Sequence, residues 1–207
     1  MDYKKIITGM IQVNTYIIHN NVDECLIIDP SDGCGEVLSY LQKENLRPLA
    51  ILLTHGHFDH IMGIPEILKV YNEAKIYIHD NDKYMLSDPV INRSARRNID
   101  FMYTGNAEPL TEGKMSIGSF EFNVLHTPGH TQGGCCFVFH NVCFCGDTVF
   151  ANSVGRSDFP NGNHDQLIDS ISKKIMTLPP QIILNPGHGN STTVGTERRS
   201  NPYLQDL

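Results

Sequence analysis

Residues 48–60, PLAILLTHGHFDH, join an apolar run to a short segment rich in metal-binding side chains. The run PLAILL is typical of a β-strand that is buried on both faces. Residues 55–60, which follow this run after Thr54, contain His55, His57, Asp59 and His60. Residues i and i+2 of an extended segment point the same way, so the first two histidines can hold one ion together. The other two residues, beyond the bend, can face a neighbouring position. The alternative is a polar loop that happens to be rich in histidine.

Three later motifs each place one more candidate ligand after a predicted strand. They are TPGHT with His130, FCGDT with Asp147 and PGHG with His188. Each motif alone is explained by an ordinary turn or helix cap. With the first cluster they make five histidines and two aspartates at the carboxyl ends of strands, where α/β sheets gather their functional sites. The pattern therefore predicts one shared site.

Seven nitrogen and oxygen ligands are too many for a single tetrahedral zinc, which takes three or four, so we expect two divalent ions. The two predicted ligand groups are His55, His57 and His130 for one ion, and Asp59, His60 and His188 for the other. Asp147 is expected to bridge, because each carboxylate oxygen can bind a different ion. Imidazole and carboxylate suit zinc, our first expectation, and also iron or manganese. Two such ions lower the pKa of a shared water from about 15.7 toward 7, which yields hydroxide at neutral pH.

Apolar periodicity predicts strands and helices in two similar α/β halves. The expected strands are residues 10–19, 25–29, 48–53, 75–78, 114–117, 120–125, 135–139, 142–146 and 181–184. The expected helices are residues 33–45, a helix starting near Pro65, and residues 81–87 and 164–176. A turn at Asn20-Asn21 joins the first two strands, and residues 88–111 form a long surface connection beside the site. No linker separates the halves, so a single domain over residues 1–207 is predicted.

Composition limits the class of protein. The chain has 207 residues, of which 40% are hydrophobic and 19% charged, as in soluble globular domains. A net charge of −7 argues against a nucleic-acid partner held by a basic surface, although bound cations would cancel part of that charge. No apolar run approaches the roughly 18 residues of a membrane helix, and no signal peptide is evident. With six cysteines and no disulfide framework, we expect a cytoplasmic protein without a membrane partner. The oligomeric state is not predicted.

Four of the six cysteines fall in one predicted hairpin, residues 135–146. With a two-residue turn, Cys136 faces Cys145 and Val138 faces Cys143, so that three thiols share one side. A soft-metal or redox site is one interpretation. Core packing is the other, and it is favoured because free cysteine is among the most buried residue types.

The motifs THGHFDH, TPGH, GDT and PGHG, in that order, resemble those of the metallo-β-lactamase superfamily, and the full ligand set resembles its glyoxalase II group. The resemblance implies an α+β fold, an αββα four-layer sandwich with a dinuclear site at one edge, and the ligand roles given above. β-Lactamases of the superfamily typically lack the second histidine of the Asp-His pair and use cysteine where Asp147 stands. Flavo-diiron proteins carry glutamate where His57 stands, and the nucleases need inserted domains.

Two further stretches, GRSDFP at residues 155–160 and TTVGTERRSNP at residues 192–202, resemble short bacterial glyoxalase II-like hydrolases. The resemblance implies that Arg156 binds substrate; the alternative is that it pairs with Asp158. It also implies that Asp29 orients a ligand histidine, rather than only capping the turn before Ser31. Larger glyoxalase II enzymes add a C-terminal helical domain that supplies much of the glutathione site. We expect that domain to be missing here, which leaves the thiol carrier open.

The leading hypothesis is hydrolysis of a small-molecule thioester, such as S-lactoylglutathione, by hydroxide shared between two metals. In it, Asp59 is the catalytic residue that orients the hydroxide or accepts its proton. The alternative is a persulfide dioxygenase with one iron held by His55, His130 and Asp147. A third hypothesis is a non-catalytic protein that binds metal or serves as a scaffold. Such a protein does not need seven ligands arranged around a water that substrate can reach.

Overall fold

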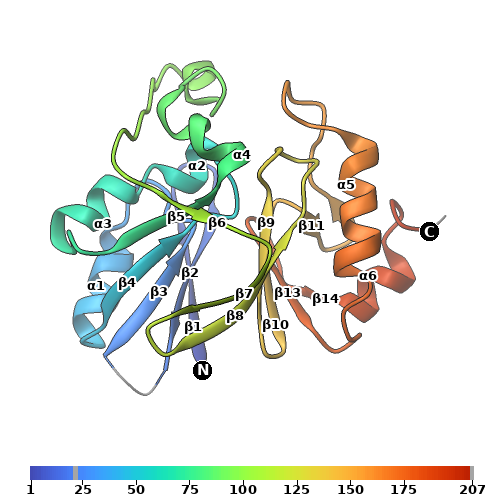
Figure 1. Cartoon of the computed structure of the whole chain (residues 1–207), viewed down its shortest axis with the longest axis horizontal. Helices are drawn as coiled ribbons and strands as arrows, with labels where there is room; N and C mark the ends of the chain where they lie inside the picture. Colours follow the sequence, from blue (N-terminus) through green and yellow to red (C-terminus); the bar gives the residue numbers. More distant parts are fainter. Residues whose placement is uncertain (21–22, 206–207) are drawn as a thin grey trace.

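Two six-stranded β-sheets lie face to face in the computed structural model, which describes residues 1–20 and 23–205 (Figure 1). The first sheet has the order β1-β2-β3-β4-β5-β6 and the second β14-β13-β10-β9-β8-β7. The strands of the first sheet are β1 (Asp2–Thr8), β2 (Val13–His19), β3 (Glu24–Ile28), β4 (Arg47–Leu52), β5 (Lys75–His79) and β6 (Glu108–Leu110). Those of the second are β7 (Gly113–Ile117), β8 (Phe120–His126), β9 (Cys135–Phe139), β10 (Val142–Gly146), β13 (Ile183–Pro186) and β14 (Thr192–Thr193). A separate small ribbon pairs β11 (Val149–Phe150) with β12 (Ser153–Val154).

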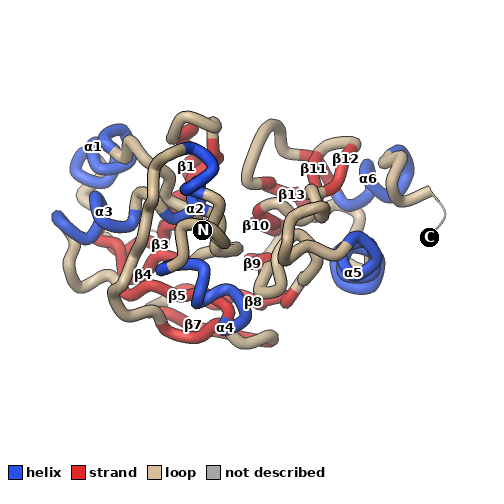
Figure 2. Tube along the Cα trace, turned by 90° about the horizontal axis from the view of Figure 1, so that it is seen from above, coloured by secondary structure: helices blue, strands red, loops and turns tan. Residues whose placement is uncertain are grey.

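Helices cover the outer face of each sheet. They are α1 (Gly35–Lys43), α2 (Phe58–Ile61), α3 (Ile64–Val70), α4 (Asp80–Lys83), α5 (His164–Ser170) and α6 (Val194–Ser200). Three further turns are η1 (Tyr84–Ser87), η2 (Ser94–Arg97) and η3 (Ile171–Ile175), the last a π-helical continuation of α5. Seen from above, α1 and α3 lie on one outer side and α5 and α6 on the other (Figure 2). The predicted αββα sandwich is therefore confirmed. No helix in the described residues has the length and apolar character needed to cross a membrane.

Three hydrophobic clusters separate these four layers, because successive strand residues point to opposite faces. In β2, Ile17 packs toward α1 and α3, whereas its neighbours Tyr16 and Ile18 pack between the sheets. In β9, Phe137 lies between the sheets and Cys136 packs toward α5 and α6. Apolar residues on both strand faces, as in PLAILL, are what a sheet covered on both sides requires.

The cysteines of the β9–β10 hairpin belong to the hydrophobic core. Val138 pairs with Cys143, as the predicted two-residue turn requires. Cys136, Cys143 and Cys145 are fully buried in the cluster under α5. Within residues 1–20 and 23–205, no cluster of potential metal ligands includes a cysteine. These contacts agree with the core-packing interpretation.

The main elements match the sequence expectations, with several differences at their edges. The strand expected over residues 10–19 begins at Val13, because Gly9 and Gln12 take left-handed backbone angles in a turn. β1 was not predicted, because its only buried residues are Ile6 and the polar Thr8 and the strand therefore shows little apolar periodicity. The short β6, β11, β12 and β14 and the polar α6 were also missed, because such pieces show little periodicity. The predicted Asn20-Asn21 turn lies partly outside the described residues. A single domain stays a prediction.

Candidate metal centre

Seven side chains from both halves of the chain meet above the ends of the strands. His55 and His57 follow β4, Asp59 and His60 lie on α2, His130 follows β8, Asp147 follows β10 and His188 follows β13. β10 and β13 are parallel neighbours, so Asp147 and His188 emerge at the same sheet edge. Four of the histidines are buried, whereas Asp59, Asp147 and His188 are partly exposed. The structure thus brings all seven predicted residues together.

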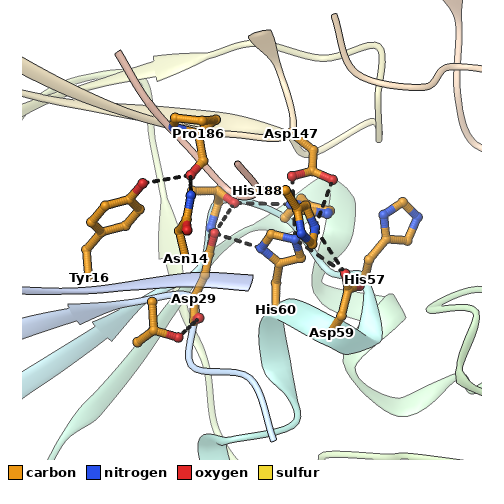
Figure 3. A network of polar contacts seen from close by, with 12 residues as sticks. Asn14, Tyr16, Asp29, His57, Asp59, His60, Asp147, Pro186 and His188 are labelled. Atoms are coloured by element: carbon orange, nitrogen blue, oxygen red, sulfur yellow. Dashed lines mark hydrogen bonds and ion pairs between the residues drawn. The ribbon is translucent and has the colours of Figure 1, made fainter. Parts of the chain in front are cut away.

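The side chains form two groups with a carboxylate between them. One ligand atom from each residue lies within 4.8 Å of the others in both His55–His57–His130 and Asp59–His60–His188, the same triplets that the sequence predicts. Asp147 Oδ1 lies 3.6 Å from His60 Nε2, and Asp147 Oδ2 lies 3.7 Å from Nε2 of His130 and of His188. Figure 3 shows Asp59, His60, Asp147 and His188 turned toward one another. Asp147 is therefore placed to serve both groups.

Unpartnered buried atoms show that this cluster fits cations. His55 Nε2, His60 Nε2 and Asp147 Oδ1 are buried and have no hydrogen-bond partner among the residues that the structure describes. Burying a polar atom without a partner costs free energy, so such atoms are rare in native proteins. All three are metal-ligating atom types, and they belong to the two groups and to the carboxylate between them. The residues present accordingly make a binuclear His/Asp metal site.

Hydrogen bonds on the far ring nitrogen orient three of the histidines. His60 Nδ1 donates to Asp29 Oδ2 over 2.9 Å, His130 Nδ1 to the Arg156 carbonyl over 2.6 Å, and His188 Nδ1 to the Gln12 carbonyl over 3.3 Å. In each ring Nε2 is left for the site, the usual arrangement for ligand histidines.

Asp29 makes the contact that its predicted orienting role requires. Its carboxylate also accepts hydrogen bonds from the Thr54 backbone N–H (2.8 Å) and hydroxyl (2.6 Å). The side chain is buried, and the residue has a positive φ of 49°. Asp29 is thereby fixed between the end of β4 and His60. The orienting role itself stays a prediction.

Charges in the cluster favour neutral imidazoles in the first ligand group and positive charge beside the carboxylates of the second. Burial and neighbouring imidazoles lower the pKa of His55 and of His57, so both rings stay neutral. Burial also disfavours a charge on His60, but the carboxylates of Asp59, Asp147 and Asp29 outweigh it and raise the pKa of His60 to about 10. Burial raises the pKa of Asp59, but the attraction of His60 and His188 is stronger and lowers this pKa below its usual range. The carboxylates thus attract positive charge, which divalent cations supply.

The loop that carries His188 is clamped by β2. Asn14 Nδ2 donates to the Pro186 carbonyl (3.0 Å) and the Gly189 carbonyl (2.9 Å), and the Tyr16 hydroxyl donates to the Pro186 carbonyl over 2.7 Å (Figure 3). At Gly187 a Cβ would lie only 2.4 Å from Asp147 Oδ1 and 2.6 Å from His60 Cε1, so a larger residue would displace these side chains. Asn14 was not predicted from the sequence. The one signal was a polar residue close to the apolar residues Val13, Ile17 and Ile18 of the expected strand.

Asp82 links the first motif to the second and was also missed. This fully buried carboxylate accepts hydrogen bonds from the Gly56 N–H (3.1 Å), the Gly133 N–H (2.6 Å) and the Thr131 hydroxyl (2.6 Å). Burial raises its pKa, although these donors favour its charged form. Gly56 lies between His55 and His57, and Thr131 follows His130. Asp82 therefore fixes the spacing of the first ligand group.

We expect Asp82→Asn to weaken metal binding and destabilise the fold. An amide presents one NH2 group, so at least one of the buried N–H donors loses its acceptor, at a cost of about 1–3 kcal/mol in unfolding free energy. Loss of a hydrogen bond that holds metal ligands in place, without itself touching the metal, typically lowers metal affinity about 10–100-fold. Urea unfolding and metal titration measure the two effects. The exposed Asp80, on the same short helix, provides the Asp80→Asn control. An Asp82→Asn variant with wild-type values in both assays would refute the role.

A cavity of about 440 Å³ opens over the cluster. Its floor includes His57, Asp59, His130 and Asp147. Its walls contain an apolar set (Ile11, Phe150, Val154 and Phe159) and an arginine set (Arg93, Arg96, Arg97 and Arg156). The Arg156 guanidinium is paired with Asp158 through contacts of 2.9 and 2.7 Å, which is the alternative considered from the sequence. Substrate binding by Arg156 stays a prediction.

Comparisons with known proteins agree with this geometry. A family model described as the metallo-beta-lactamase superfamily matches residues 8–188. The probable metallo-hydrolase YqgX of Bacillus subtilis is 36% identical over 99% of this chain and 98% of its own length. The hydroxyacylglutathione hydrolase GloC of Haemophilus influenzae is 34% identical over 93% of each chain.

Two solved structures share the fold over their whole length. The BLEG-1 B3 metallo-beta-lactamase superposes with a TM-score of 0.94 at 38% identity, covering 99% of this chain and all of that one. TTHA1623, solved in a di-iron-bound form, gives a TM-score of 0.88 at 33% identity, covering 97% of this chain and all of that one.

Proposed function

The chain belongs to the metallo-beta-lactamase superfamily and is a metal-dependent hydrolase with a binuclear His/Asp site, and within that class we propose that it hydrolyses thioesters such as S-lactoylglutathione. The observation that carries the proposal is the pair of complete ligand groups with Asp147 between them. Support also comes from the similarity to a relative named hydroxyacylglutathione hydrolase.

His55, His57 and His130 would hold one cation, Asp59, His60 and His188 the other, and Asp147 both. When bound, two divalent ions polarise a carbonyl and lower the pKa of a nearby water toward neutrality. Zinc is the metal that we propose first. Iron and manganese suit the same donors, and one similar protein was solved with two irons.

Side chains that face the cavity can orient a water, shield the ligands and bind the acyl group. Asp59 lies on the cavity floor with its Oδ2 3.4 Å from His188 Nε2, where its carboxylate can orient a water or accept its proton. Phe159 packs edge-on against the rings of His57 (5.3 Å between centroids) and His130 (5.7 Å). This contact shields one side of the ligand group from solvent. The apolar wall, which includes Ile11, is suited to the carbon chain of an acyl group.

Hydrolysis of S-lactoylglutathione by metal-replete protein, followed by loss of thioester absorbance, tests the proposal. We expect turnover, and we expect Asp59→Asn to lower kcat by about 10²–10⁴-fold, the usual contribution of a positioned acid or base. Asp80→Asn, which changes an exposed carboxylate outside the cavity lining, is the matched control. Turnover no faster than that of Asp59→Asn, on this and on simpler thioesters, would refute the proposal.

Two other activities are distinguished in the same experiment. A dioxygenase would hold one iron through His55, His130 and Asp147, and would consume oxygen with glutathione persulfide. The complete second group around His188 argues for hydrolysis instead. Because one similar structure is a B3 metallo-beta-lactamase, benzylpenicillin serves as a counter-substrate. Faster turnover of either competing substrate than of any thioester would replace the proposed function.

A further inference from the structure

The cavity above the ligands has a concentrated positive wall. Four of the seven arginines in the chain line it (Arg93, Arg96, Arg97 and Arg156), and no lysine does. This concentration occurs in a protein whose net charge is −7. Arginine is suited to carboxylates and phosphates, because its planar guanidinium donates two parallel hydrogen bonds to them.

The turn that carries three of these arginines is tied to the metal centre. The residues on either side of Arg93 are both fully buried. Asn92 donates to the carbonyls of Met85 and Phe101, each over 3.0 Å, and its Oδ1 accepts the Ser94 N–H over 3.0 Å. The Asn92 carbonyl also accepts the N–H of Phe58, which lies between two of the ligands. The turn is therefore a fixed part of the cavity wall.

Arg93 itself is held in an unusual conformation that turns it toward the site. Its φ is +74°, in the left-handed region that side chains rarely adopt. Such a conformation persists where the surroundings impose it, often at binding sites. The guanidinium carbon lies 3.7 Å from the centre of the Phe159 ring, the ring that also packs against His57 and His130. The charge is thus placed at the edge of the ligand group.

Three of the four arginines form no ion pair with any residue that the structure describes. Arg156 is neutralised by Asp158. Among the residues that the structure describes, Arg93, Arg96 and Arg97 make no ion pair within 4.0 Å. Burial lowers the pKa of Arg93, and repulsion from Arg96 and Arg156 lowers it further, outweighing the weaker attraction of Asp158 and Asp59. An anion bound in this wall would relieve that repulsion.

We propose that Arg93, Arg96 and Arg97 form an anion-binding site that selects thioesters whose thiol carrier bears two or more carboxylate or phosphate groups. The site rests on the proposed thioesterase function and adds to it the recognition of the carrier. The carrier lies along the arginine wall, and the acyl group lies on the apolar wall with its carbonyl over the ligands.

Three thioesters with the same lactoyl group test the site. Their carriers are N-acetylcysteamine, which is uncharged, glutathione, which has two carboxylates, and coenzyme A, which has phosphates. We expect higher kcat/KM for the charged carriers, with a preference that narrows as salt is added. Arg93→Gln, and separately the double variant Arg96→Gln/Arg97→Gln, should lower kcat/KM for charged carriers by about 10–100-fold, mainly through KM. Turnover of the uncharged thioester should stay unchanged. The charged carrier that loses more identifies carboxylate or phosphate recognition.

Two controls separate the local site from general charge effects. Arg199→Gln removes one exposed charge from α6, and Lys173→Gln/Asp169→Asn removes an exposed ion pair outside the cavity without changing net charge. Both should retain wild-type selectivity. Equal losses on all three carriers, no loss on any, or a loss in either control as large as that in Arg93→Gln would overturn the site.

A binding measurement keeps the site testable if no thioester is turned over. Failure to hydrolyse even the uncharged thioester would refute the proposed function, whatever the arginines do. Calorimetry with unreactive S-methylglutathione and S-methyl coenzyme A then measures the anion site alone. We expect at least one of them to bind wild-type protein about 10–100-fold more tightly than Arg93→Gln. Equal affinity of both proteins for both compounds would refute the anion site.

Discussion

Replacing Asp147 by asparagine is expected to abolish hydrolysis and to leave fewer than two metal ions per chain. The two carboxylate oxygens lie 3.6 Å from His60 Nε2 and 3.7 Å from Nε2 of His130 and His188. Asparagine keeps one oxygen, loses the negative charge and turns an NH2 group toward a ligand histidine. We expect kcat to fall at least about a thousandfold, the scale seen when a preorganised electrostatic group is removed.

Elemental analysis and thioester kinetics on the same Asp147→Asn preparation measure both effects. The exposed Asp169, far along α5, supplies the control Asp169→Asn, which should keep two ions and full activity. If Asp147→Asn retained two ions and wild-type turnover, Asp147 would not lie between two cations in the working protein.

Removing the metals is expected to lower the melting temperature by about 5–15 °C. Without cations, carboxylates and imidazoles stay buried with unsatisfied atoms such as His55 Nε2. Ligands that bind only the folded state stabilise it by about 2.7 kcal/mol at 100 times Kd and about 4.1 kcal/mol at 1,000 times Kd. For a chain of this size each kcal/mol corresponds to about 2–4 °C.

Thermal unfolding before and after dialysis against a chelator measures this shift, and added zinc should restore the original value. His188→Ala loses a ligand of only one group, so chelation should shift its melting temperature less than that of the wild type. An unchanged melting temperature in protein that has lost two measured ions would show that the cluster gains no stability from them.

The sequence predicted the ligand groups because their determinants are local. PLAILL marks a strand covered on both faces, and His55 and His57 sit two residues apart where that strand ends. The motifs of His130, Asp147 and His188 were weak singly, yet all follow strands whose ends meet at one edge of the fold.

Residues whose role depends on tertiary contacts could not be predicted. Asp82 looks like an ordinary polar residue until folding places Gly56 and Gly133 against its carboxylate. Arg93 lies in a connection without periodicity, and its direction is set by a left-handed backbone and by the buried Asn92 beside it. The GRSDFP motif drew attention to Arg156, but spacing alone did not decide between substrate binding and the pairing with Asp158 that the structure shows.

Metal stoichiometry is the most direct test of a centre built from two ligand groups. Metal-free protein is titrated with zinc, the bound metal is counted by elemental analysis, and the His188→Ala variant is treated in parallel. Two ions per wild-type chain, and a weakened second ion in the variant, are the predicted results. One ion per wild-type chain at saturating metal, with no difference in the variant, would contradict a binuclear centre.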